Sequence, residues 1–426
     1  MMNFVFFLWL IILPFYQFSL VGSLSIDNMI APLLFAVWVI GYFAGVQKLS
    51  SNQIQNIFQS IVLATLYFIS HTISLLTTQG AVWTTAYVTA TNMLYFILPI
   101  LFITSIKSLK SSNDAIIVVM FIASVTALLA ALGIIEFDFF RQADSRLGED
   151  YLKKSIGIIG SYGDVGILMS LSLLFVIAGR SKEVFFGKGS YIKIIIVITL
   201  IMIGLASMQS RNMILTIFTA LIWYWIIGRW ARKSKLWYKK LYAMIFVSIF
   251  VSIMFVTLFY SPLLEFIQSV GGTKEAAGTV DDRLAQYSFM WNLVKDQIFI
   301  GVSANVYEVY EHEISLIHNM WLKELVQGGV ISVIAMFLLW WHALTVQVQN
   351  YQSGHKSNSA RVYISVLLGV LIATQFYPAG SLIFWVIIGM CSSMPCEKNK
   401  HMPDVITNKA KPDSMANKSN SYVQLR

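Results

Sequence analysis

Charged residues are scarce in this chain of 426 residues. They make up 12% of it, whereas 57% of the residues are hydrophobic and the mean hydropathy is +0.70. A soluble fold of this length could not bury so much apolar surface, so the composition excludes a soluble globular protein. It indicates instead a polytopic membrane protein, and an aromatic content of 14% suits the interfacial belts of such a protein as well as its core.

Cysteine is also nearly absent, with two residues, Cys391 and Cys396, near the end of the last apolar run. Two such residues define no disulfide framework. With the nearby His401 they form only a fragment of a metal-ligand set, so we expect neither a metal site nor a cofactor.

The first apolar run, residues 4–21, has no basic segment before it and no small-residue cleavage site after it. These two absences predict a retained membrane span rather than a cleaved signal peptide.

Apolar runs predict an all-α integral membrane protein with about twelve transmembrane helices. Residues 193–228 are apolar apart from a polar cluster at 207–212. As one helix they would run roughly 54 Å against a hydrocarbon core of about 30 Å, so we expect a turn at Arg211. Tyr377-Pro378-Ala379-Gly380-Ser381 should likewise divide residues 361–392. The expected spans are residues 4–22, 29–46, 57–77, 85–106, 115–135, 160–179, 193–208, 211–228, 241–260, 319–345, 361–376 and 380–392.

The basic residues predict the orientation of these spans. Most of the 30 lysine and arginine residues fall on one side when successive spans alternate in direction, and the positive-inside rule makes that side cytoplasmic. Both termini are then cytoplasmic. Residues 1–392 form a single polytopic membrane domain, and residues 393–426 form a disordered cytoplasmic tail rich in Asn, Ser and Lys. The net charge of +9 is then explained by topology and by contact with anionic membrane lipids, not by nucleic acid.

The longest polar stretch between spans is a large loop, residues 261–318, on the opposite, extracytoplasmic side. Thr279-Val-Asp-Asp282 fits a capping box that opens a helix, and Gly301 should close that segment. The apolar residues recur there at helical spacing: Leu284, Tyr287, Trp291, Val294 and Ile298. Short amphipathic helices of this kind lie along a membrane surface or fold back over the bundle. Their aromatic side chains suit either packing on the bundle or stacking on sugar rings.

Three residues on the extracytoplasmic side are candidates for chemistry. Arg211 opens a span, where an arginine either reaches the interface or binds the oxygens of a diphosphate with its planar fork. Arg283 lies in the first turn of the predicted loop helix. His318 opens the next span and is either interfacial or a base for an acceptor hydroxyl. The spans themselves are nearly free of ionisable groups, and His71 is an exception.

Three stretches, in this order, resemble the O-antigen ligase and O-antigen polymerase superfamily of bacterial envelope glycan enzymes. They are Gln209-Ser210-Arg211; then Asp282-Arg283-Leu-Ala-Gln-Tyr-Ser-Phe-Met-Trp291 with Gly301-Val-Ser; and His318-Asn319-Met-Trp-Leu-Lys-Glu-Leu-Val-Gln-Gly-Gly. The resemblance covers about residues 200–345. The chain departs from the family by lacking a proline before Gly301 and a second glycine two places after Gly329. These departures concern the ends of helices.

The resemblance implies a fold similar to that of the C-type membrane glycosyltransferases and a metal-independent transfer reaction on the periplasmic face of the bacterial inner membrane. The donor would be a glycan on undecaprenyl diphosphate, and the acceptor a glycan or lipid A–core. By match to the family's motifs, Arg211 and Arg283 would bind the diphosphate, and His318 would activate or position the acceptor hydroxyl. Asn319, Trp291 and Tyr287 are candidate acceptor or sugar contacts. Alternative bases are Glu311, Glu313, Asp281 and Asp282.

Three functions remain open. The first is a polymerase of O-antigen or other surface polysaccharide repeat units, and the second is the ligase that transfers the finished glycan to lipid A–core. The third, from another class, is a transporter or flippase for the same lipid-linked glycan. A transporter predicts charged groups within the spans, whereas an enzyme predicts polar groups gathered on one outer face.

Overall fold

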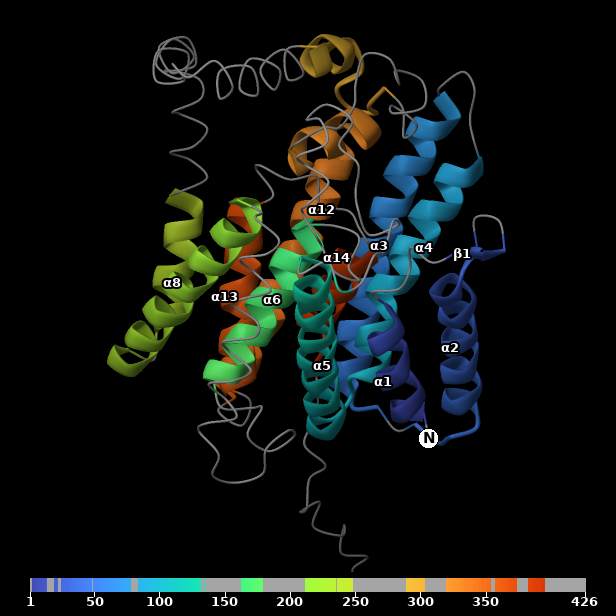
Figure 1. The fold of residues 1–426 in the computed structure, drawn as a ribbon. Helices are drawn as coiled ribbons and strands as arrows, with labels where there is room; N and C mark the ends of the chain where they lie inside the picture. The colour runs from blue at the N-terminus through green and yellow to red at the C-terminus, as the bar shows by residue number, and fades with distance from the viewer. Residues whose placement is uncertain are drawn as a thin grey trace, which may run out of the picture. The chain divides into compact units, whose positions relative to one another are not determined.

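In the computed structural model, the described part of the chain is mainly helical, as the composition predicts (Figure 1). A short antiparallel pair of strands, β1 (Ser19–Val21) and β2 (Leu24–Ser25), separates the first two helices. The structure describes residues 2–13, 19–21, 24–47, 49–77, 83–131, 134, 162–178, 211–234, 236–247, 289–302, 319–353, 357–373 and 382–394. All of them belong to one compact unit, Met1–Cys396. Of the predicted tail, residues 395–426 lie outside the described residues.

The described helices overlap most of the predicted spans, whereas the predicted span at residues 193–208 lies outside the described residues. They are α1 (Met2–Ile12), α2 (Ile26–Phe43), α3 (Ser51–Thr77), α4 (Trp83–Phe102), α5 (Ile106–Ala131), α6 (Tyr162–Ile177), α8 (Arg211–Lys233), α12 (Met320–Gln352), α13 (Ser357–Ala373) and α14 (Leu382–Cys391). Residues 237–247 are also helical, and a short helix at 289–294 continues into a 3-10 turn, Lys295–Gln297. Helix α8 is described from Arg211 onward, and the predicted turn before it stays a prediction because residues 201–210 lie outside the described part. Residues 361–392 contribute to two separate helices, as predicted.

Among the described residues, four helices are long and apolar enough to cross a membrane: Ser51–Leu76, Ile106–Thr126, Ile214–Arg232 and Met320–Gln352. Shorter apolar helices include Ile30–Phe43, Thr89–Phe102, Gly166–Ile177 and Asn358–Ile372. An all-α membrane protein is therefore the class that the structure supports. The number of about twelve spans stays a prediction.

The prediction of one helical span over residues 4–22 is wrong. Helix α1 ends at Ile12 after 11 residues, a length of about 16 Å, and residues 19–21 are a strand. Pro14 follows closely in the sequence, and a proline cannot supply the N–H that a continuing helix needs.

Helices α3 and α5 begin earlier than hydropathy predicts because serine caps determine their first turns. The backbone N–H of Ser50 donates to Gln53 Oε1 at 3.0 Å, and the N–H of Gln53 donates back to Ser50 Oγ at 3.4 Å. Ser105 and Ser108 exchange the same pair of bonds before α5, at 3.0 and 3.1 Å. These capping boxes satisfy N–H groups that the helices leave unpaired, so the polar first turns are helical as well.

Side-chain contacts show how the central helices run. Ser60 of α3 meets His342 of α12 at 3.0 Å, and Tyr67 meets Glu324 at 3.0 Å, so the two helices are antiparallel. The Cys391 carbonyl of α14 accepts from the Gln347 amide at 2.5 Å, and the Ser393 carbonyl just after α14 accepts from Asn350 at 3.2 Å, so α12 and α14 are parallel. Both directions agree with the alternation deduced from the basic residues, and the cytoplasmic identity of either face stays a prediction.

The C-terminal end of α14 is held by amide side chains from its neighbours. Besides Gln347, Asn56 of α3 donates to the Ser392 carbonyl at 2.9 Å, and Asn350 of α12 donates to the Ser393 carbonyl at 3.2 Å. The last carbonyls of a helix have no partner within it, so these amides satisfy them in a buried setting.

Helices α8 and α13 pack around a single arginine. The guanidinium of Arg361 lies over the Tyr224 ring with 3.7 Å between Cζ and the ring centroid, and Nε donates to the Tyr224 carbonyl at 2.8 Å. Gly228 makes room for it, because a Cβ there would lie 2.1 Å from the guanidinium.

Candidate functional site

The structure places two of the predicted site residues in full. Asn319 is the N-cap of α12, and its Oδ1 accepts from the Leu322 N–H at 3.0 Å. This residue therefore shapes the start of the helix that follows His318. Trp291 lies on the short helix at 289–294 and is 51% exposed.

The remaining predicted residues are Arg211, Arg283, Tyr287 and His318. Arg211 is the first residue of α8, and its side chain lies outside the described part of the chain. Arg283, Tyr287 and His318 lie outside the described residues altogether, as do the alternative bases named above. The geometry of the site is therefore built from the segments that flank them.

Helix α12 is kinked at Gly329, which has φ 69° and ψ −168°. The kink divides α12 into an N-terminal segment, residues 320–328, and a C-terminal segment, residues 330–352. The sequence analysis assigned the departure near Gly329 to a helix end, which agrees with the structure, because the first helical segment ends at this glycine and a second one follows directly. Only glycine adopts such backbone angles without strain.

The loop segment at residues 289–302 packs into this kink. In an unbroken helix the Val330 N–H would donate to the Val326 carbonyl. Here the Val330 N–H donates to the Ile298 carbonyl at 2.8 Å, and the Val326 carbonyl accepts from the Val302 N–H at 2.8 Å. The loop backbone thus satisfies the two polar groups that the kink turns out of the helix.

Glycines allow the two backbones to come this close. A Cβ at Gly329 would lie 2.2 Å from the Phe299 carbonyl oxygen. Gly301 has φ +82°, and a Cβ there would lie 2.7 Å from both the Gly329 nitrogen and the Val326 oxygen. We call this contact between residues 298–302 and 326–330 the glycine junction. The prediction that Gly301 closes the loop helix is confirmed, since its N–H donates to the Gln297 carbonyl at 2.8 Å.

Beside the junction a small apolar cluster joins the loop helix to α12. Met290, Val294 and Val326 are fully buried in it, whereas Trp291 points outward. The predicted apolar face therefore holds for Val294, and the buried residue one turn before it is Met290. Of the two roles left open for the aromatic side chains, the exposure of Trp291 does not fit packing on the bundle.

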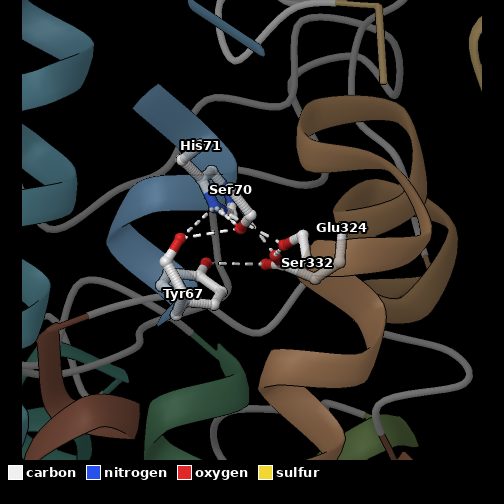
Figure 2. A network of polar contacts seen from close by, with 5 residues as sticks. All are labelled: Tyr67, Ser70, His71, Glu324 and Ser332. Carbon is white, nitrogen blue, oxygen red and sulfur yellow. Dashed lines mark hydrogen bonds and ion pairs between the residues drawn. The ribbon is translucent and has the colours of Figure 1, made fainter. Parts of the chain in front are cut away.

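On α3 and α12 a buried polar network surrounds the carboxylate of Glu324 (Figure 2). The Tyr67 hydroxyl donates to Oε1 at 3.0 Å, and the Ser332 hydroxyl donates to Oε2 at 2.7 Å. His71 Nε2 lies 3.3 Å from Oε2. The Ser70 hydroxyl donates to the Tyr67 carbonyl at 2.7 Å, which completes the group drawn in Figure 2.

This network spans the kink. Glu324 lies on the N-terminal segment of α12, and Ser332 lies on the C-terminal segment. Gly328 lets the two sides approach, because a Cβ there would lie 2.6 Å from Ser332 Cβ and 3.3 Å from His71 Cε1. One carboxylate therefore connects both segments of α12 to α3.

Sequence reasoning noted His71 and missed Glu324, Tyr67 and Ser332. The available signal was a histidine in one apolar span and a carboxylate in another, which together suggest a buried pair. Glu324 was overlooked because it stands next to Lys323 near the start of its helix, where both residues fit an interfacial position.

Comparison of the chain with protein-family models and with curated protein sequences gives no match in either case.

Proposed function

We propose that this protein is a membrane glycosyltransferase that uses an undecaprenyl-diphosphate-linked glycan as donor and polymerises the repeat units of O-antigen or another surface polysaccharide. The observation that carries the proposal is the glycine junction. It joins the stretch ending in Gly301-Val-Ser to the stretch that begins at His318-Asn319, and these are two of the three motif stretches on which the resemblance rests.

The junction supports a shared site because described residues stand on both sides of residues 303–318 in the sequence. Residues 289–302 are fixed at one end of residues 303–318, and Asn319 is fixed at the other as the cap of α12. His318 is one residue from that cap, and Arg283 precedes the docked helix by a few residues. Both are thus tethered close to one structural unit.

The chemistry assigned to these residues is coherent. Arg211 and Arg283 would bind the diphosphate and stabilise its charge as it leaves, without a metal. His318 would activate or position the acceptor hydroxyl. Asn319, Trp291 and Tyr287 would contact the acceptor or the sugar, and the exposure of Trp291 leaves its ring accessible for stacking.

In this proposal about twelve spans cross the bacterial inner membrane and both termini are cytoplasmic. The large loop at residues 261–318 and the active site face the periplasm. Transfer to lipid A–core by a ligase uses the same motifs and the same site, so it differs from polymerisation in the acceptor alone.

A specific observation favours a second candidate, a transporter for the lipid-linked glycan. The His71–Glu324 contact places ionisable groups inside the helix bundle, as a substrate or proton path would. Against this, the Glu324 carboxylate already contacts three polar groups from α3 and α12. A carboxylate whose partners all come from the protein suits a structural connection between helices.

The test uses the full-length protein in liposomes with a lipid-diphosphate-linked oligosaccharide, with and without lipid A–core, and resolves the products on a gel. A ladder without lipid A–core supports the polymerase, and product only with lipid A–core supports the ligase. We expect His318→Ala, Arg211→Ala and Arg283→Ala each to lose product while inserting normally. Arg229→Ala, an exposed arginine of α8, is the matched control and should retain it.

Normal glycan from all three variants would refute the site. No transfer by the unaltered protein beside an active control enzyme would refute the enzyme and favour the transporter, which a flux assay with the same lipid then tests.

A further inference from the structure

The His71–Glu324 contact is an unusual feature for a membrane-embedded bundle. Both side chains are buried, with exposures of 5% and 1%. Ionisable groups are costly inside a membrane, and a buried ion pair gives little stability compared with apolar residues of similar size. Its presence therefore requires an explanation other than stability.

The donors and acceptors around His71 define how it connects the two helices. His71 Nε2 faces the Glu324 carboxylate, and His71 Nδ1 lies 3.2 Å from the Tyr67 carbonyl oxygen, which can only accept. The Ser70 and Ser332 hydroxyls lie 3.4 Å from Nδ1, but they already donate to the Tyr67 carbonyl and to Glu324. Both ring nitrogens thus face acceptor oxygens, so the imidazole bridges the Tyr67 carbonyl and the Glu324 carboxyl group.

The pair lies where it controls the N-terminal segment of α12. Glu324 is five residues before the kink at Gly329 and five after the cap at Asn319. Its partners Tyr67 and His71 are on α3, whereas Ser332 lies beyond the kink. Removing the charge would release this segment from α3 while leaving both helices otherwise packed.

We propose that His71 and Glu324 are positioning residues for the transfer reaction. Their ion pair holds residues 320–328, and with them the cap residue Asn319, at a fixed angle to α3. This inference rests on the proposed function, because it assigns the pair to the placement of that site. Neither residue contacts the substrate in this scheme.

Glu324→Gln is the sharpest single change because it keeps the size of the side chain. The amide presents an NH₂ group where the carboxylate had an acceptor oxygen, so one of the surrounding donors loses its partner. The reversed pair, His71→Glu with Glu324→His, restores one charge of each sign. Tyr67→Phe removes one donor and leaves the pair intact.

The first arm measures transfer kinetics in liposomes. We expect Glu324→Gln to lower kcat about tenfold with little change in KM for the lipid-linked donor, because the pair affects placement and not donor binding. Tyr67→Phe should have a smaller effect, and the reversed pair should recover most of the loss. Tyr363→Phe is the matched control, since it removes a buried hydrogen bond to Asn113 between α5 and α13, outside the network.

The second arm measures geometry without reference to activity. Spin labels are placed at Phe58→Cys on α3 and Gln327→Cys on the N-terminal segment of α12, with Cys391 and Cys396 replaced by serine. Phe58 is 65% exposed and accepts a label. We expect Glu324→Gln to broaden the distance distribution between these labels. A control pair at Phe58 and Ile334, beyond the kink, should not change.

The outcomes separate this inference from the proposed function. Unchanged distances in Glu324→Gln overturn the inference whether or not the protein transfers glycan. An equal kcat loss in Tyr363→Phe, or broadening at both label pairs, also overturns it by indicating a general packing defect. If the unaltered protein transfers no glycan, the proposed function fails, and selective broadening still supports the pair as the support of this segment.

Discussion

Replacing Gly329 by alanine tests whether the glycine junction holds the loop on α12. The backbone at Gly329 has φ 69° and ψ −168°, a conformation that an L residue adopts only with strain. The added Cβ would also lie 2.2 Å from the Phe299 carbonyl oxygen, so the loop backbone would have to move away. Both effects act on the same contact and both weaken it.

The expected loss follows from two contributions. Backbone strain at such a position costs about 1–3 kcal/mol. Displacing the loop also weakens the Val330-to-Ile298 and Val302-to-Val326 hydrogen bonds, each with a net value of about 0.5–1.5 kcal/mol. We therefore expect a loss of about 2–6 kcal/mol, concentrated at the junction because the rest of α12 packs independently of the loop.

Gly45→Ala is the matched control for the strain alone. Gly45 has φ +70°, and a Cβ there would meet nothing within 4 Å, so this variant adds about 1–2 kcal/mol of strain without a clash. Amide hydrogen exchange over residues 289–302 provides the local measurement. It should rise more than about tenfold in Gly329→Ala and remain unchanged in Gly45→Ala. Equal protection of this segment in both variants would refute the argument that the glycines permit docking.

Three further predictions concern stability and metal dependence. Gln347→Leu should lower the free energy of unfolding by about 1–3 kcal/mol because the Cys391 carbonyl loses its donor. The assay follows the reaction of the buried Cys391 thiol with a dye during heating, in a Cys396→Ala background. Arg361→Lys should cost about 1–2 kcal/mol in the same assay, since an ammonium cannot both stack on Tyr224 and donate from the Nε position. Glycan transfer should be unchanged by a chelator, and loss of product that added metal restores would contradict the metal-independent mechanism.

Much of the helical framework is predictable from the sequence because a long apolar run has few alternatives to a membrane helix. The separation of α13 from α14 follows from a break in such a run. Hydropathy fails where side-chain chemistry determines the boundary. It misses the polar first turn of α3, which depends on the Ser50–Gln53 capping box, and it extends α1 past Ile12.

The site is less predictable because its contacts join residues far apart in the chain. Nothing near Glu324 in the sequence indicates that Tyr67 and His71 are its partners, and only the antiparallel packing of α3 on α12 brings them together. The glycines that form the kink are adjacent in the sequence, but the residues that pair with the opened backbone groups are distant. Gly328-Gly329 is compatible with a helix end, and the loop backbone that satisfies the open hydrogen bonds lies about 30 residues earlier in the sequence.

The kink explains why the two features of the site occur together. Opening α12 at Gly329 frees an N–H and a carbonyl, and the loop supplies partners for both. The same opening weakens the continuity of the helix, so residues 320–328 need a second support, and the Glu324 carboxylate provides it by contacting α3 and Ser332. The loop and the ion pair therefore hold one short segment in common.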